Sequence, residues 1–221
     1  MSIINSIQAI QIIDSRGTPT VSCKVILDNG IYATSMVPSG ASTGSREALE
    51  LRDHNADFMG KGVSKAVANI NEVIAPTLIG MDVTNQQEID EKMLALDGTS
   101  SKSKLGANAI LGVSLAVLNA GSKVLKQPLY KYINQVFFNI NGEKPKMRMP
   151  TPMLNIINGG EHANNNIDIQ EFMIMPVGAD NFSQAMQWSI EIYSDLKNIL
   201  NSNGLSTSVG DEGGFAPNLQ S

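Results

Sequence analysis

The chain has 221 residues, 42% of them hydrophobic and 17% charged, which allows one large or two ordinary domains and excludes a disordered tail or a collagen-like rod. Its net charge of −5 argues against a nucleic-acid binder with a broad basic surface. Polar residues interrupt every apolar stretch before the ~20 residues of a membrane span, and the single cysteine, Cys23, agrees with a reducing cytoplasmic compartment.

The first 40 residues predict β-strands. Hydrophobic side chains occur at every second residue of the segment 21–27. This period of two is typical of a strand in a sheet with one buried face. Asn29-Gly30 predicts a hairpin with a type I′ turn, leading into a strand over 31–37. A third strand is expected over 7–13, with a turn at 14–17.

Helical spacing begins after Lys61. The first helix is expected to exit at Pro76 and Gly80. Thr84 is expected to cap a second helix that Asp97-Gly98 ends. A third, buried helix is predicted over 107–125, and a short fourth begins at Pro128. Strands followed by helices indicate an α+β domain, which we place at residues 1–137.

Residues 138–149 combine turn formers with a local basic cluster and are interpreted as a linker, with a binding patch as the alternative. Apolar segments follow at 153–157 and 172–177. A long amphipathic helix then carries one predicted buried stripe, made of Phe182, Met186, Ser189, Tyr193, Leu196 and Leu200.

Three polar, glycine-rich segments are candidates for chemistry. The first, 38–44, contains Ser42 and could close over an anion or place an oxygen on Mg²⁺; a flexible surface turn is the alternative. The second, 158–163, contains His162, although a lone histidine is more often structural. Gln170 and Glu171 lead into an apolar run, so alternation would place one on each face at the end of a strand.

The third segment, 210–214, holds Asp211 and Glu212 between glycines, and an ordinary acidic turn is the alternative. A functional role requires one carboxyl that keeps its proton and works as a general acid or base. Two histidines and one cysteine are too few and too scattered for a classical zinc site. Motifs of serine hydrolases, P-loop enzymes and dinucleotide oxidoreductases are missing from the sequence.

These segments, together with residues 14–17 and 102–110, closely resemble segments of the enolase family (phosphopyruvate hydratase), in its bacterial form. They occur in the same order along the chain. The resemblance implies an α+β N-terminal capping domain, an antiparallel meander sheet with helices, over 1–137. It also implies a linker over 138–149 and the first, incomplete part of an enolase-type (β/α)₈ TIM barrel over 150–221.

The resemblance also implies the activity, which is the reversible dehydration of 2-phosphoglycerate to phosphoenolpyruvate with two Mg²⁺ ions that stabilise an enolate. By resemblance, Glu212 is the proton donor and Glu171 lies beside it. Gln170 contacts the substrate, His162 is carried on a mobile loop, and Ser42 binds the second Mg²⁺.

In the family, the base, the phosphate-binding arginine and the ligands of the first Mg²⁺ lie in a further stretch of sequence. We therefore expect the 221-residue polypeptide alone to be inactive and its second half to be unstable by itself. The full-length protein is expected to be a cytoplasmic homodimer or larger homo-oligomer. The alternatives are a superfamily enzyme acting on another carboxylate and a non-catalytic binding or structural module.

Overall fold

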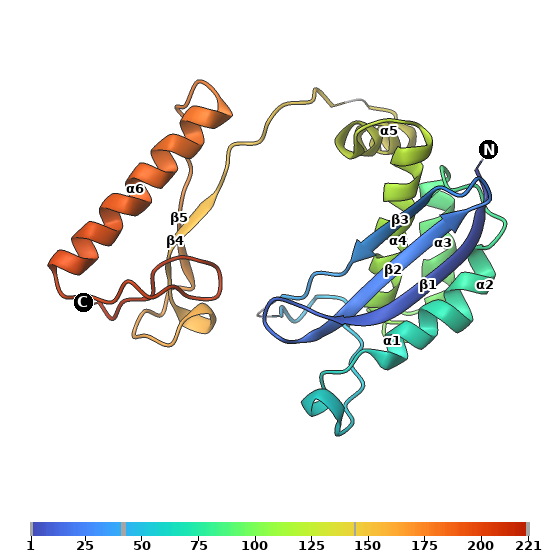
Figure 1. Ribbon diagram of the computed structural model, residues 1–221, viewed down its shortest axis with the longest axis horizontal. Coiled ribbons are helices and arrows are strands. Elements are labelled where there is room, and N and C mark those ends of the chain that lie inside the picture. The colour runs from blue at the N-terminus through green and yellow to red at the C-terminus, as the bar shows by residue number, and fades with distance from the viewer. Residues whose placement is uncertain (1, 41–42, 144, 220–221) are drawn as a thin grey trace. The chain divides into compact units, whose positions relative to one another are not determined.

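The protein consists of two compact units, each described here by itself. The computed structural model describes residues 2–40, 43–143 and 145–219. Unit 1 comprises residues 1–39 and 44–146, and unit 2 comprises residues 40–43 and 147–221. Unit 1 has a three-stranded sheet and unit 2 a two-stranded one (Figure 1).

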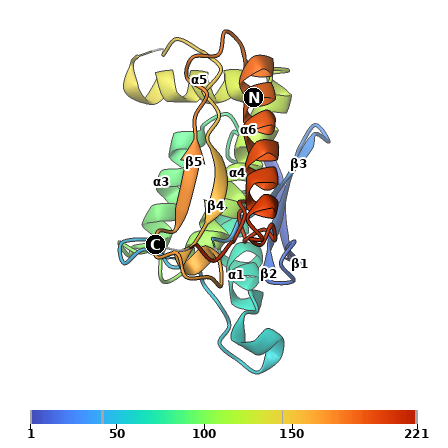
Figure 2. The ribbon, with the colours of Figure 1, turned by 90° about the vertical axis from the view of Figure 1, so that its left-hand side faces the viewer.

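The sheet of unit 1 is an antiparallel meander of β1 (Ile4–Ile13), β2 (Pro19–Leu27) and β3 (Tyr32–Met36), in the order β1-β2-β3. The predicted alternation on β2 is confirmed, since Val21, Cys23, Val25 and Leu27 are all buried. The helices of the unit cover one face of this sheet (Figure 2). The buried side chains of β2 therefore face the helices and form the centre of the core.

The hairpin between β2 and β3 has a different turn from the one predicted. Gly30 has a positive φ of 79°, whereas Asn29 is not among the residues with positive φ, so the type I′ expectation is wrong. The amide of Gly30 donates to the carbonyl of Leu27, and the amide of Leu27 donates to the carbonyl of Ile31. Three loop residues therefore connect the strands, and only the last one needs the left-handed conformation.

The first long helix runs through Pro76 rather than ending there. It is built from α1 (Ser64–Ala68), a π-helical segment η2 (Asn69–Ile74) and α2 (Ala75–Leu78), preceded by the short turn η1 (Asp57–Gly60). Proline lacks the amide that an α-helix needs and its ring crowds the carbonyl four residues earlier. The wider π segment directly before Pro76 accommodates both effects, so the helix continues to Leu78.

The other helices of unit 1 are α3 (Gln86–Asp97), α4 (Ala107–Val124) and α5 (Leu129–Asn141). α3 ends at Gly98 as predicted, but its N-cap is Asn85 and not Thr84, whose hydroxyl donates instead to Asp82 at 2.8 Å. α5 has thirteen residues and is not short. It extends four residues into the segment 138–149, so that only the later part of this segment lacks helix.

α4 is the central helix of unit 1 and packs against β2 and β3. Within the described residues it alone is long and apolar enough to cross a bilayer by length and composition. Its buried residues, Val113, Ala116 and Val117 among them, belong to the hydrophobic core. Packing in that core accounts for its apolar character.

Unit 2 contains β4 (Leu154–Asn158), the short helix η3 (Gly160–His162), β5 (Glu171–Ile174) and α6 (Phe182–Ser202), with β4 and β5 antiparallel. The Asn181 side chain caps α6 by accepting from the amide of Gln184 at 2.9 Å. The predicted stripe of α6 is partly or fully buried except for Phe182, which is exposed.

Much of the apolar surface of unit 2 is exposed. The apolar segment 172–177 belongs to strand β5 only as far as Ile174, and Met175 and Val177 beyond it are exposed. Among the described residues of this unit, few apolar side chains are buried, and they include Ala185, Leu200 and Phe215. Exposed ones include Phe172, Met173, Trp188, Ile192 and Ile199. The described part of unit 2 thus has little apolar core between its strands and α6.

Candidate active site

The candidate site lies in unit 2, in the loop that follows β4. Gly159 passes so close to the neighbouring loop that a Cβ atom there would lie 2.5 Å from the carbonyl oxygen of Ile167, and closer still to that of Ile169. No side chain fits against these backbone atoms. The glycine therefore lets the chain turn directly from the strand into η3, which carries His162.

Backbone hydrogen bonds join the acidic loop 210–214 to the same strand end. The amide of Asn158 donates to Phe215 and the amide of Phe215 donates to Ile156, both at 2.9 Å. The amide of Asp211 donates to the carbonyl of His162 at 3.1 Å. Segments about fifty residues apart in the sequence are in this way held side by side, and Glu212 is brought to His162.

The buried imidazole of His162 is the centre of the site. Its Nε2 lies 2.6 Å from Nε2 of Gln170. Its Nδ1 lies 3.6 Å from Oε2 of Glu171 and 3.7 Å from Oε1 of Glu212. Four of the five residues singled out from the sequence therefore form one cluster. Gln170 precedes β5, so strand alternation does not apply to it, and both it and Glu171 reach the same ring instead of being separated by the sheet.

The cluster can hold and move protons. With the amide nitrogen of Gln170 as donor, Nε2 of His162 accepts, and Nδ1 faces the two carboxylates at 3.6 and 3.7 Å, beyond hydrogen-bond distance. His162 is 5% exposed, whereas the side chains of Glu171 and Glu212 are 32% and 47% exposed. The histidine is thus a fixed support, and the carboxyl groups are the parts that a ligand can reach.

Two further residues support the cluster and were missed by the sequence analysis. Asn155 of β4 places its Nδ2 3.5 Å from Oε2 of Glu171. Its signal was an amide between the apolar residues Leu154 and Ile156. Tyr193 of α6 stacks on Phe215 with ring centroids 4.3 Å apart, and its hydroxyl donates to the carbonyl of Gly213 at 2.8 Å. Burial raises the pKa of the Tyr193 hydroxyl, which keeps it a donor.

Ser42, the remaining predicted site residue, lies outside the described residues. Ser39, in the same segment, belongs to unit 1 and is held by three side chains. Arg16 donates to its carbonyl at 2.6 Å, its hydroxyl donates to Glu50 at 3.1 Å, and Arg52 donates to its hydroxyl oxygen at 3.3 Å. The start of the loop that contains Ser42 is therefore firmly anchored in unit 1.

One group of side chains among the described residues could hold a metal ion. Ligand atoms of His162, Glu171 and Glu212 all lie within 4.8 Å of one another, and Nδ1 of His162 is buried without a hydrogen-bond partner. An imidazole nitrogen with two carboxylates suits a transition metal or Zn²⁺, whereas Mg²⁺ favours a shell of oxygen atoms. This cluster is therefore not a typical Mg²⁺ site, and Ser42, the one residue that the resemblance assigns to Mg²⁺, lies outside the described residues.

Comparison with known protein families gives two matches that follow each other along the chain. The family described as "Enolase, N-terminal domain" matches residues 4–133. The family described as "Enolase, C-terminal TIM barrel domain" matches residues 146–221. The first match covers unit 1 almost entirely, and the second covers the site around His162. The predicted fold, an α+β domain followed by the first part of an enolase-type barrel, is confirmed, and the chain belongs to the enolase family.

Proposed function

We propose that this chain provides the acid side of an enolase active site, which interconverts 2-phosphoglycerate and phosphoenolpyruvate. The observation that carries the proposal is the meeting of Glu171 and Glu212 at Nδ1 of the buried His162. Carboxyl groups held beside one imidazole nitrogen are the kind of side chain that general acid catalysis uses to give a proton to a leaving group. The family membership of the chain agrees with this chemistry.

In the forward direction, a base outside the described site removes the proton next to the substrate carboxylate. The electron pair of that C–H bond forms the new C=C bond, and the C–O bond to the departing hydroxyl breaks. We assign the proton that converts this hydroxyl to water to Glu212, the more exposed carboxyl. Glu171 and His162 hold the position of Glu212 and return a proton to it afterwards.

Gln170 is assigned to the substrate, because its exposed amide lies directly next to the cluster. Ser42 is assigned to the second Mg²⁺ by resemblance alone. When bound, the two Mg²⁺ ions of the family stabilise the negative charge that builds up on the substrate carboxylate. Since neither the base nor the first metal site has a candidate among the described residues, we propose that the 221-residue polypeptide alone is inactive.

The test compares Glu212→Gln with the unaltered native gene product, whose intact mass is established first. Glutamine keeps the shape of the side chain but cannot donate the carboxyl proton, so turnover should fall by about 10²- to 10⁴-fold with little change in KM. The matched control is Glu191→Gln on the exposed face of α6, whose carboxylate accepts only from Gln187. Near-normal turnover of Glu212→Gln would remove the assignment, and robust turnover by the 221-residue polypeptide would remove the proposal that it is inactive.

We also propose a cytoplasmic location and a homodimer or larger homo-oligomer for the complete protein. Both rest on the family resemblance, and the buried single thiol of Cys23 agrees with a reducing compartment. Light scattering of the native gene product at several concentrations tests the oligomeric state. A monomer at all concentrations contradicts it.

A further inference from the structure

Three consecutive asparagines, 164–166, lie in the loop of unit 2 that carries His162, the histidine loop (residues 159–170). Each of them has different surroundings. Asn164 is exposed and forms no hydrogen bond with any other described residue. Asn165 and Asn166 use both the nitrogen and the oxygen of their side chains, and their partners lie in different parts of the unit. These two asparagines therefore have roles in the fold that Asn164 lacks.

Asn165 ties the histidine loop to the end of β4. Its Nδ2 donates to the carbonyl of Asn158 at 2.8 Å, and its Oδ1 accepts from the amide of Ile167 at 3.2 Å. Asn158 is the last residue of the strand and directly precedes Gly159. The middle of the loop is thus held against the strand from which the loop begins.

Asn166 joins the histidine loop to the segment that follows the acidic loop 210–214. Its Nδ2 donates to the carbonyl of Leu219 at 2.7 Å, and its Oδ1 accepts from the amide of Leu219 at 2.9 Å. Its own amide donates to Oδ1 of Asn218 at 3.1 Å. One carboxamide thereby exchanges two hydrogen bonds with one residue, as paired residues of antiparallel strands do, which fixes orientation as well as distance. These three hydrogen bonds are named the Asn166 clasp.

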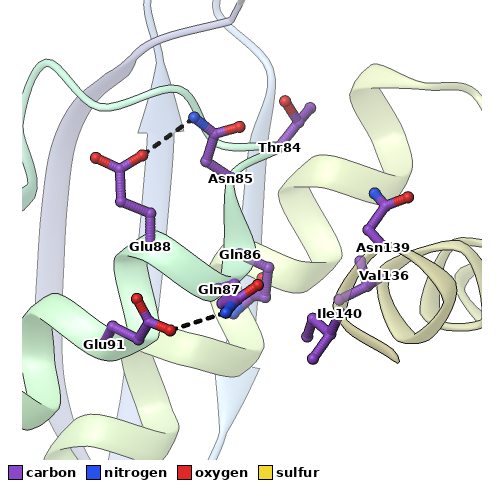
Figure 3. Close-up of a pocket in the computed structure, with 9 residues that line it drawn as sticks. All are labelled: Thr84, Asn85, Gln86, Gln87, Glu88, Glu91, Val136, Asn139 and Ile140. Carbon is purple, nitrogen blue, oxygen red and sulfur yellow. Dashed lines mark hydrogen bonds between the residues drawn. The ribbon is translucent and has the colours of Figure 1, made fainter. Parts of the chain in front are cut away.

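The Asn166 clasp connects distant parts of the chain, whereas the carboxamide of Asn85 in unit 1 bonds locally. Nδ2 of Asn85 donates to Glu88 at 3.2 Å, across the first turn of α3 (Figure 3). That bond spans three residues, but the bond from Nδ2 of Asn166 to Leu219 spans 53. The bond of Asn85 affects the end of one helix. The clasp instead determines how two separate segments lie relative to each other.

The histidine loop and the acidic segment are joined at two places. The amide of Asp211, next to Glu212, donates to the carbonyl of His162 at 3.1 Å, and farther along both segments Asn166 meets Leu219. The bonds of the clasp are exposed, so water replaces them when they break and they add little to stability. Few apolar side chains are buried in the described part of unit 2. Hydrogen bonds, more than packing, therefore determine where these loops lie.

We propose that Asn166 is a positioning residue for the proton transfer assigned to Glu212. It does not touch the reacting atoms, and it acts by holding the histidine loop where His162 and Gln170 meet the acidic loop. The inference rests on the proposed function, because the position of the loop affects turnover only if Glu212 takes part in the reaction. Displacement of a catalytic group by about 1 Å lowers a rate by up to about 100-fold, so bonds that add little stability still control turnover.

The test is a double-mutant cycle on the turnover of 2-phosphoglycerate by the native gene product. Asn166→Ala should lower kcat about tenfold in the otherwise unaltered protein. In the Glu212→Gln background the same substitution should lower kcat by less than about twofold, because the group that the clasp positions is already lost. Asn164→Ala is the matched control and should have no effect in either background. Equal losses of kcat in the two backgrounds show a purely structural role and overturn the proposal.

Amide hydrogen exchange separates positioning from folding. Exchange in residues 160–170 should be faster in Asn166→Ala than in Asn164→Ala, with the same thermal midpoint. A lower midpoint with unchanged exchange in this loop contradicts the proposal. If Asn166→Ala does not fold, Asn218→Ala takes its place, since it removes one bond of the clasp and should lower kcat about threefold. Unchanged kcat in the variant that folds overturns the proposal, whereas near-normal turnover of Glu212→Gln removes the proposed function instead.

Discussion

Nε2 of Gln170 lies 2.6 Å from Nε2 of His162, so that an amide nitrogen and an imidazole nitrogen face each other at hydrogen-bond distance. With the amide nitrogen as donor, the ring nitrogen that it faces accepts, and the neutral ring carries its proton on Nδ1. The amide of Gln170 therefore determines which nitrogen of His162 is turned, with its proton, toward Glu171 and Glu212. This makes Gln170 a positioning residue for the carboxyl pair as well as the proposed substrate contact.

The first prediction is that imidazole ¹⁵N shifts show the Nδ1–H form of His162. Gln170→Glu should shift the proton to Nε2, because a carboxylate can only accept. Replacing the other histidine, His54, with Asn leaves a single imidazole to observe, and asparagine tolerates the positive φ of 53° at that position. Gln187→Glu on the exposed side of α6 is the control. An Nε2–H form in the unaltered protein contradicts the prediction.

The second prediction concerns Asp97, the last residue of α3. Its buried carboxylate accepts from the amide of Leu105 at 2.7 Å, from the amide of Thr99 at 3.0 Å and from the Thr99 hydroxyl. Burial by itself raises the pKa of this carboxyl, but the hydrogen bonds from Thr99 and from the Leu105 amide together lower it below its ordinary value.

A pKa lower in the folded than in the unfolded state means that the unfolded chain binds more protons in this range. The stability that Asp97 contributes is therefore complete above the unfolded pKa, about 3.9, and is lost as the pH falls through the folded pKa. Asp97→Asn should cost about 1–3 kcal/mol of unfolding free energy at pH 7 and less at pH 3. Urea unfolding followed by circular dichroism measures both values, with the exposed Asp57→Asn as control. Equal losses at the two pH values contradict the assignment.

The parts of the fold that the sequence predicted correctly depend on local patterns. The alternation around Cys23 and the glycine after Asp97 each determine structure within a few residues. The errors involve choices that such patterns leave open. Asn29 is compatible with several turns, and the register between Leu27 and Ile31 decides among them.

The site was predicted from motifs, but its support was not. The sequence analysis singled out His162, Glu171 and Glu212, and the structure brings these three side chains together. Asn155 resembles an ordinary polar position, and its role depends on a neighbour 16 residues away. Hydrophobicity alone also does not determine whether the side chain of Val177 is buried within the same chain. In the structure this side chain is exposed.

The third prediction concerns Gly159, which connects β4 to the histidine. Gly159→Ala would place a methyl group 2.5 Å from the Ile167 carbonyl, against backbone that cannot rotate away. We expect loss of the ring contacts of His162 and a fall of several kcal/mol in the stability of unit 2. Gly178→Ala is the matched control, since a Cβ there meets nothing within 4 Å. The prediction fails if both variants keep the same His162 chemical shifts and the same unfolding midpoint.

The last prediction is that the two units unfold separately, with unit 2 the weaker. The chain offers one reporter for each unit, since it has a single tryptophan, Trp188, and a single cysteine, Cys23. Trp188 lies on α6, where few apolar residues are buried, whereas Cys23 lies in the extensive core of unit 1. Because about 25 cal/mol is gained for each Å² of apolar surface buried, the smaller core should unfold at the lower urea concentration.

Burial raises the pKa of the Cys23 thiol to about 12, so it should react with thiol reagents only when unit 1 opens. Trp188 fluorescence should change at a lower urea concentration than the one at which Cys23 becomes reactive. Leu200→Ala should lower only the Trp188 midpoint, and Val25→Ala should lower only the Cys23 midpoint. Each substitution should cost about 2–4 kcal/mol of unfolding free energy, which is typical of large-to-small core substitutions. The prediction is contradicted if the two transitions coincide and each variant shifts both of them. The two units would then unfold as one cooperative body, because a cavity in one unit would destabilise the other.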